Sequence, residues 1–182
     1  MANQLTPNNP LVQEIRELVK NARITVAQQV NTQLLSTYWQ IGRAIVEYEQ
    51  QSQLRAEYGK QALKELSKEL TKEFGKGFSV SNIQFMRRFY QTYSIQQTVS
   101  VKLSWSHYCE LLSISDANKR SFYEKEAVNS NWSVRELKRQ IDSSLYERLL
   151  LSNGDANKEK VLSLAQKGIE INQPADIIRD PY

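Results

Sequence analysis

A stretch near the middle of the chain carries side chains suited to reading nucleic acid. Residues 79–93 hold two arginines and no acidic residue. Asn, Gln and Arg can make paired hydrogen bonds to base edges, and Ser suits phosphate oxygens. On a helix the outward positions would be Ser81, Asn82, Gln84, Phe85, Arg87, Arg88 and Gln91, and Ser79 is expected to join the polar ones in contacting nucleic acid. The exposed aromatic residue, Phe85, could stack, fill an interface or belong to the core. The alternative interpretation of the whole stretch is a packed helix with incidental polar residues.

Five lysines precede this stretch at strict four-residue spacing: Lys60, Lys64, Lys68, Lys72 and Lys76. Each step of four drifts by about 40° around a helix, so the row spirals over roughly 160° if the helix reaches Lys76. An acidic row, Glu65, Glu69 and Glu73, runs beside it, and each glutamate has a lysine three residues later. The row therefore predicts either diffuse attraction of phosphates or a solvated face with local ion pairs.

The net positive charge is concentrated in this region. The 182 residues include 24 basic and 20 acidic residues, which gives a net charge of +4. Residues 58–93 contain seven basic and three acidic residues, or +4, whereas the remainder contains 17 of each. A polyanion would therefore be attracted to residues 58–93.

Several kinds of catalytic site are disfavoured. A single cysteine and a single histidine cannot form a disulfide framework or an ordinary zinc site. His107 and Cys109 lie two apart, so on a helix they diverge, and we expect structural roles for both. The E-x-K spacing of restriction-type nucleases occurs at Glu136-Leu137-Lys138, within a helical pattern. We expect no catalytic residue, metal or cofactor in this chain. The polar N-terminal residues are unlike a signal peptide and the single cysteine fits a reducing compartment, so we predict a cytoplasmic protein.

Helical patterns dominate, so we predict an all-α bundle. One long helix, or a helix pair broken at Ile24-Thr25-Val26, should cover residues 11–48. A second helix should cover 58–74 with Leu63, Leu66, Leu70 and Phe74 on one face. Gly75 and Gly77 are candidate C-caps, Ser79 or Ser81 is the candidate N-cap of the next helix, and its expected inward row is Ile83, Met86, Tyr90 and Tyr93.

Further helices are expected downstream. One short helix lies within 103–114 with Ser104 or Ser106 as its cap, and another follows Asp116 as far as Val128. A capping box at Ser133–Glu136 opens a helix through Leu149, with Val134, Leu137, Ile141, Leu145 and Leu149 inward. Ser152-Asn153-Gly154 should stop it. A weaker helix over 159–166 and a tail complete the chain. The predicted domain division is residues 1–150 and 151–182.

Several blocks together resemble a known family. They include YWQIGRAIVEYEQ (38–50), LSWSHYCELLSI (103–114) and a closing DPY (180–182). The longest are RAEYGKQALKELSKELTKEFGKGFSVSNIQFMRRFYQTY (55–93) and RSFYEKEAVNSNWSVRELKRQIDSSLYERL (120–149). The chain is similar to the N-terminal region of the YhcG-like bacterial proteins, in which a helical domain precedes a PD-(D/E)xK nuclease domain. The resemblance implies that the nuclease domain is absent here and that residues 151–182 lead toward it.

These observations predict a non-catalytic DNA-binding and targeting domain of a restriction-like nuclease system. It would contain a helix-turn-helix-like unit at about residues 60–93. Its expected partners are DNA and a nuclease domain in cis or in trans, without a membrane. The rival hypothesis is a protein-interaction module, because the two apolar rows of residues 11–48 invite self-association, including a homodimer.

Overall fold

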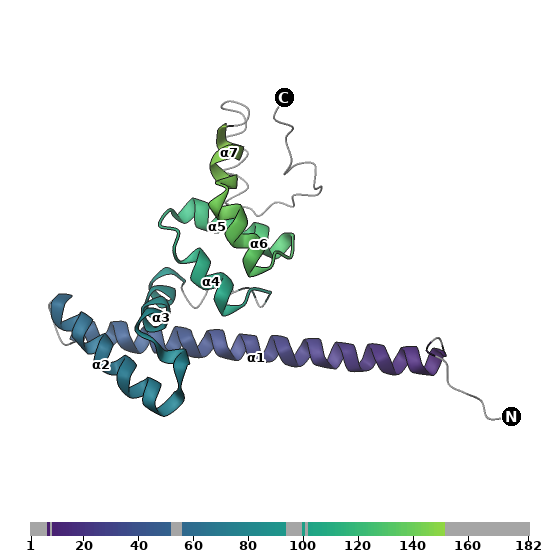
Figure 1. Ribbon diagram of the computed structural model, residues 1–182, viewed down its shortest axis with the longest axis horizontal. Helices are drawn as coiled ribbons and strands as arrows, with labels where there is room; N and C mark the ends of the chain where they lie inside the picture. The colour runs from purple at the N-terminus through teal and green to yellow at the C-terminus, as the bar shows by residue number, and fades with distance from the viewer. Residues whose placement is uncertain (1–6, 8, 52–55, 94–99, 101, 152–182) are drawn as a thin grey trace.

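In the part of the chain that the structure describes, every regular element is helical (Figure 1). The computed structural model describes residues 7, 9–51, 56–93, 100 and 102–151. The elements in chain order are α1 (Pro10–Gln51), α2 (Ala56–Phe74), η1 (Lys76–Phe78), α3 (Val80–Thr92), α4 (Trp105–Leu111), α5 (Ala117–Asn129), α6 (Val134–Asp142) and α7 (Leu145–Leu151). The all-α prediction is confirmed. The helix expected over 159–166 and the stop at Ser152-Asn153-Gly154 lie outside the described residues. None of the described helices is long and apolar enough to cross a membrane.

α1 forms the long axis of the molecule as one unbroken helix of 42 residues. The Asn9 side chain accepts a hydrogen bond from the Leu11 backbone N–H at 2.9 Å at its start. The break considered at Ile24-Thr25-Val26 does not occur. β-Branched residues lower helix propensity by only tenths of a kcal/mol each, and no glycine or proline stands there to interrupt the ladder.

α3 crosses α1 at close range through a glycine. A Cβ atom added to Gly42 would stand 2.0 Å from the backbone oxygen of Met86, so only glycine fits this crossing. The inner side chains of α3 are Ile83, Met86 and Phe89, and none of them is exposed. The predicted inward row was right for Ile83, Met86 and Tyr93. Tyr90 is only half-buried, and Phe89 was missed.

The main core joins the end of α3 to α4–α7. Its fully buried large side chains include aromatic rings of Phe89, Tyr108, Phe122 and Tyr123. A smaller cluster of Ile45, Leu63 and Ile83 joins α1, α2 and α3. The described residues therefore form a large core, built mainly by α3–α7, and a small one where α1, α2 and α3 meet.

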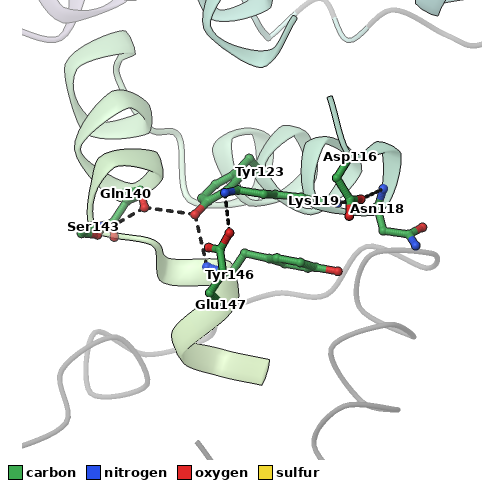
Figure 2. A network of polar contacts seen from close by, with 8 residues as sticks. All are labelled: Asp116, Asn118, Lys119, Tyr123, Gln140, Ser143, Tyr146 and Glu147. Atoms are coloured by element: carbon green, nitrogen blue, oxygen red, sulfur yellow. Dashed lines mark hydrogen bonds and ion pairs between the residues drawn. The ribbon is translucent and has the colours of Figure 1, made fainter. Parts of the chain in front are cut away.

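The prediction of a single helix from the Ser133 capping box to Leu149 is wrong in one respect, because this segment forms two helices. α6 ends at Asp142, and Ser144 adopts a positive φ of 54° before α7 begins. Figure 2 shows what holds this corner: the Tyr123 hydroxyl donates to the Gln140 carbonyl oxygen at 3.1 Å and accepts from the Tyr146 N–H at 3.2 Å. Those long-range bonds fix a turn that the apolar spacing does not reveal.

Predicted helix caps are confirmed at the starts of α4, α5 and α6. The Asp116 carboxylate accepts from the backbone N–H groups of Asn118 and Lys119, and Ser133 accepts from the Glu136 N–H at 3.2 Å. Of the predicted capping box, the structure shows the Ser133 half, because the Glu136 carboxylate accepts from Arg139 and Gln140 instead. Ser104, rather than Ser106, caps α4. In this part of the chain, local capping chemistry determines where helices begin.

Candidate nucleic-acid interface

α2 presents the lysine row to solvent. Its inner side buries Leu63 and Ser67 and half-buries Leu66 and Leu70. The five lysines are all exposed: Lys60, Lys64, Lys68, Lys72 and Lys76. Among the described residues none of them forms an ion pair, and Glu65 instead accepts a hydrogen bond from Gln61 at 3.1 Å. The local ion pairs of the alternative interpretation are therefore not seen among the described residues.

A built turn joins α2 to α3. Gly75 has a φ of 89°, as expected of a C-cap glycine, and its N–H donates to the Thr71 carbonyl at 3.0 Å. Gly77 does not share this conformation. The hydroxyls of Ser67 and Thr71 both donate to the Phe78 carbonyl oxygen, at 2.8 and 3.2 Å. These bonds fix η1 against α2, which restricts the angle between α2 and α3.

Ser79 is the N-cap of α3, and its side chain accepts from the Asn82 backbone N–H at 3.3 Å. Ser81 is therefore free of a capping role. The exposed residues that follow are spaced by three and four, which places them on one face of the helix. They are Ser81, Gln84, Arg88 and Gln91. Arg88 is exposed and makes no ion pair with any described residue.

The Asn82 side chain is used inside the domain. Its amide nitrogen donates to the Gly77 carbonyl at 2.5 Å, and its amide oxygen accepts from the Trp105 indole N–H at 2.8 Å. Both polar ends therefore tie the turn to α4. Asn82 therefore has a structural role in fixing η1 against α4, and both ends of its amide group are already engaged.

Arg87 also has internal partners. Its Nε donates to the Glu49 carboxylate of α1 at 2.7 Å, and its Nη1 donates to the Gln91 amide oxygen at 3.4 Å. The pair is partly buried, which anchors the outer edge of α3 to the end of α1. Phe85 is half-buried and packs against the main core rather than reaching solvent.

One exposed aromatic residue was missed by the sequence pattern. Phe74 was expected on the inner face of α2, but its side chain is 62% exposed. Its ring lies 5.7 Å from the Phe78 ring, at the tip of the turn between Lys72 and Lys76. An aromatic ring flanked by lysines can rest against a sugar or a base.

The histidine and the cysteine have structural roles, as expected. Nδ1 of His107 accepts from the Ser104 N–H at 3.1 Å, which leaves Nε2–H to donate to the Trp132 carbonyl oxygen at 2.9 Å. Burial raises the pKa of the Cys109 thiol to about 11, which favours the protonated thiol at neutral pH. The described residues contain no group of three His, Cys, Asp or Glu side chains that could hold a metal.

The E-x-K residues lie on the helix α6. The Glu136 carboxylate accepts from Arg139 at 2.6 Å and from Gln140 at 2.7 Å, and the bond from Arg139 lowers its pKa. The Glu136 carboxylate therefore stabilises α6 itself.

Comparison with known proteins identifies the family. Residues 14–148 match the DUF1016 N-terminal domain. The chain is 38% identical over 200 residues to a protein of Escherichia coli (strain K12) named "Putative nuclease YhcG", an alignment that covers 92% of this chain and 52% of that protein. The chain therefore spans about half the length of this relative. No solved structure matches it. The helical chain described here belongs to the DUF1016 N-terminal domain family.

Proposed function

We propose that this domain binds duplex DNA through α2, η1 and α3, and that it acts as the targeting part of a nuclease system. The observation that carries the proposal is the exposed lysine row of α2, which has no ion-pair partner among the described residues. It adjoins a helix whose exposed face is polar, free of acids and ends in Arg88 and Gln91. Unpaired cations beside hydrogen-bonding side chains are what a phosphate backbone and base edges require.

The proposed contacts divide by chemistry. Lys60, Lys64, Lys68, Lys72 and Lys76 attract phosphates over a distance, which favours association at low salt. Ser81, Gln84, Arg88 and Gln91 make the closer contacts on α3. Ser79, Asn82 and Arg87 act through position, because the cap, the Trp105 bond and the Glu49 pair hold α3 in place. In this scheme α2 and α3 work as a helix-turn-helix-like unit.

The relation to a nuclease comes from the relative's printed name. Since this chain spans about half of that protein, we propose that cleavage belongs to a nuclease domain in cis or in trans. This domain would bring that activity to DNA without taking part in the chemistry.

The proposal is tested by a matched pair of double variants. Lys68→Gln with Arg88→Gln removes one lysine and one arginine from the proposed interface. Arg135→Gln with Lys138→Gln removes the same charges from the exposed side of α6. In a fluorescence anisotropy titration with a duplex of about 20 base pairs, the first variant should bind roughly tenfold more weakly, with a salt slope smaller by about 2. The second should bind like the unchanged protein. Equal behaviour of the two variants would defeat the assignment.

A second candidate function is a protein-interaction module. The observation in its favour is the first half of α1, where large apolar side chains are exposed without cover from any described residue. The two functions occupy different surfaces and are compatible.

A further inference from the structure

The first half of α1 projects from the bundle with an apolar stripe on it (Figure 1). The exposed large side chains include Leu11, Ile15, Leu18, Val19, Val26 and Val30. Leu18 is 64% and Val30 is 63% exposed. An isolated helix of this length is marginal in water, because most helical stability in proteins comes from packing an apolar face. Packing of the stripe against another apolar surface would therefore stabilise the first half of α1.

The stripe is a separate surface and not an extension of the bundle core. The bundle side of α1 is marked by its buried residues, Leu35, Gly42, Ile45 and Val46. At about 100° per residue, the centre of the stripe lies roughly 180° around the helix from the mean direction of these residues. A helix laid on the stripe would therefore approach from the side away from the bundle and meet no described element.

The spacing of the stripe fits a second helix of similar kind. Leu11, Ile15, Leu18 and Ala22 follow the 4-3-4 pattern of a helix-pairing seam. Beside it runs a row of valines seven residues apart: Val12, Val19 and Val26. On the other flank the corresponding row is polar: Glu14, Asn21 and Gln28. The two flanks of the seam thus have different chemistry.

This asymmetry selects the direction of pairing between two copies. In a parallel pair each flank meets the opposite flank of its neighbour, so valines would face Glu14, Asn21 and Gln28. In an antiparallel pair each flank meets its own kind, so valines meet valines and polar residues meet polar residues. No like charges are brought together across the flanks, because Glu14 meets Gln28 of the other copy. Both flanks of the seam therefore meet flanks of their own chemistry only when the copies run in opposite directions.

We propose that two copies of this chain pair antiparallel through the first half of α1, with the two-fold axis near Val19. The centre follows from the valine row, since Val12 and Val26 are equally distant from Val19 along the helix. The two bundles then lie at opposite ends of the helix pair, with their Gly42 crossings roughly 70 Å apart at 1.5 Å per residue. This inference rests on the second candidate function and does not require DNA binding.

Light scattering after size exclusion tests the pairing with the full chain. The unchanged protein should have the mass of a dimer, and Leu18→Glu should have that of a monomer. Ala27→Glu introduces the same charge on the outer side of the same helix and should remain a dimer. A monomeric unchanged protein at 100 µM or more, or a dimeric Leu18→Glu variant, overturns the proposal. Urea unfolding followed by tryptophan fluorescence checks that the bundle of the variant stays folded.

Cysteine cross-linking tests the direction in a Cys109→Ser background. Val19→Cys should form an intermolecular disulfide in high yield, because the two copies of residue 19 meet at the axis. Leu11→Cys should not, since its copies lie at opposite ends. The reverse result would show a parallel pair and contradict the proposal. Absence of a disulfide in both variants would also contradict it.

An anisotropy titration of Leu18→Glu with duplex DNA separates the two proposals. If this variant is monomeric and still binds DNA, DNA binding does not depend on the pairing of two copies.

Discussion

The α2–α3 pair and the α5–α6 pair are built alike and hold their charges differently. Each consists of two helices joined by a short turn, residues 75–79 in one and 130–133 in the other, and each turn contains a residue with positive φ, Gly75 or Asn131. In the α5–α6 region several cations are engaged: Lys119 pairs with Glu147 at 2.5 Å, and Arg139 pairs with Glu136 at 2.6 Å. In α2 no lysine is paired with a described residue. Two cations of the α5–α6 region therefore contribute to cohesion through ion pairs, whereas the lysines of α2 pair with no described residue.

The two pairs also differ in anchoring. Phe122, Tyr123 and Leu137 lie wholly inside the main core, and the network in Figure 2 locks α5 to α6 and α7. α2 rests on the small cluster around Leu63, and α3 depends on its crossing with α1. A change at that crossing should therefore affect the proposed interface before it affects the main core.

The largest effect is expected at the crossing itself. Gly42→Ala forces a Cβ against the Met86 carbonyl, a backbone atom that cannot move aside alone, and should lower the free energy of unfolding by about 3 kcal/mol. Gly59→Ala, where a Cβ meets nothing within 4 Å, should raise it by up to about 1 kcal/mol. Urea unfolding measures both. If the two variants are equally stable, the close crossing does not control α3.

A pH-dependent change in stability of similar size is expected in the α5–α6 pair. Glu126 is buried with a carboxylate oxygen that lacks a hydrogen-bond partner, and desolvation raises its pKa to about 7. The folded protein therefore keeps a proton that the unfolded chain releases near pH 4.3. Stability should fall as pH rises from about 4.5 to 7, by about 3 kcal/mol, and stay lower above that.

Unfolding of the Glu126→Gln variant between pH 4.5 and 8 isolates this contribution. The variant should show a smaller fall, because burial also raises the pKa of Glu124, and it should be the more stable protein at pH 8. Glu136→Gln is the matched control, because the pKa of Glu136 is lowered, so the fall should persist in it. An unchanged pH profile in Glu126→Gln would show that this carboxyl is already ionised in the folded protein.

The smallest effect separates position from contact within α3. Asn82→Ala removes the bonds to Gly77 and Trp105 and should cost about 1–2 kcal/mol of stability. Gln84→Ala, on the exposed face, should change stability by less than about 0.5 kcal/mol and should weaken duplex binding instead. A stable Asn82→Ala variant with altered base preference would move Asn82 back among the contact residues.

Much of the fold could be predicted because its signals are local. The caps at Ser79, Asp116 and Ser133 and the turn at Gly75 depend on residues within four positions of each other. The lysine row could be predicted for the same reason, since a four-residue spacing on an amphipathic helix places it outward.

Other features depend on partners distant in sequence. Arg87 meets Glu49 across 38 residues, and Asn82 meets Trp105 across 23. Nothing in residues 79–93 distinguishes those two side chains from Arg88 and Gln84. The end of α6 likewise follows from bonds between Tyr123 and later residues, and the spacing of apolar residues alone favoured one longer helix.

Lysine acetylation with and without duplex DNA, read by mass spectrometry, tests the central claim most directly, because it needs no variant. The account predicts that DNA protects Lys64, Lys68 and Lys72 on α2. Lys20 on the first half of α1 and Lys138 on α6 are exposed and should react equally in both samples. Protection of Lys138 without the α2 lysines, or no protection at a DNA concentration that saturates binding, would contradict the proposed interface.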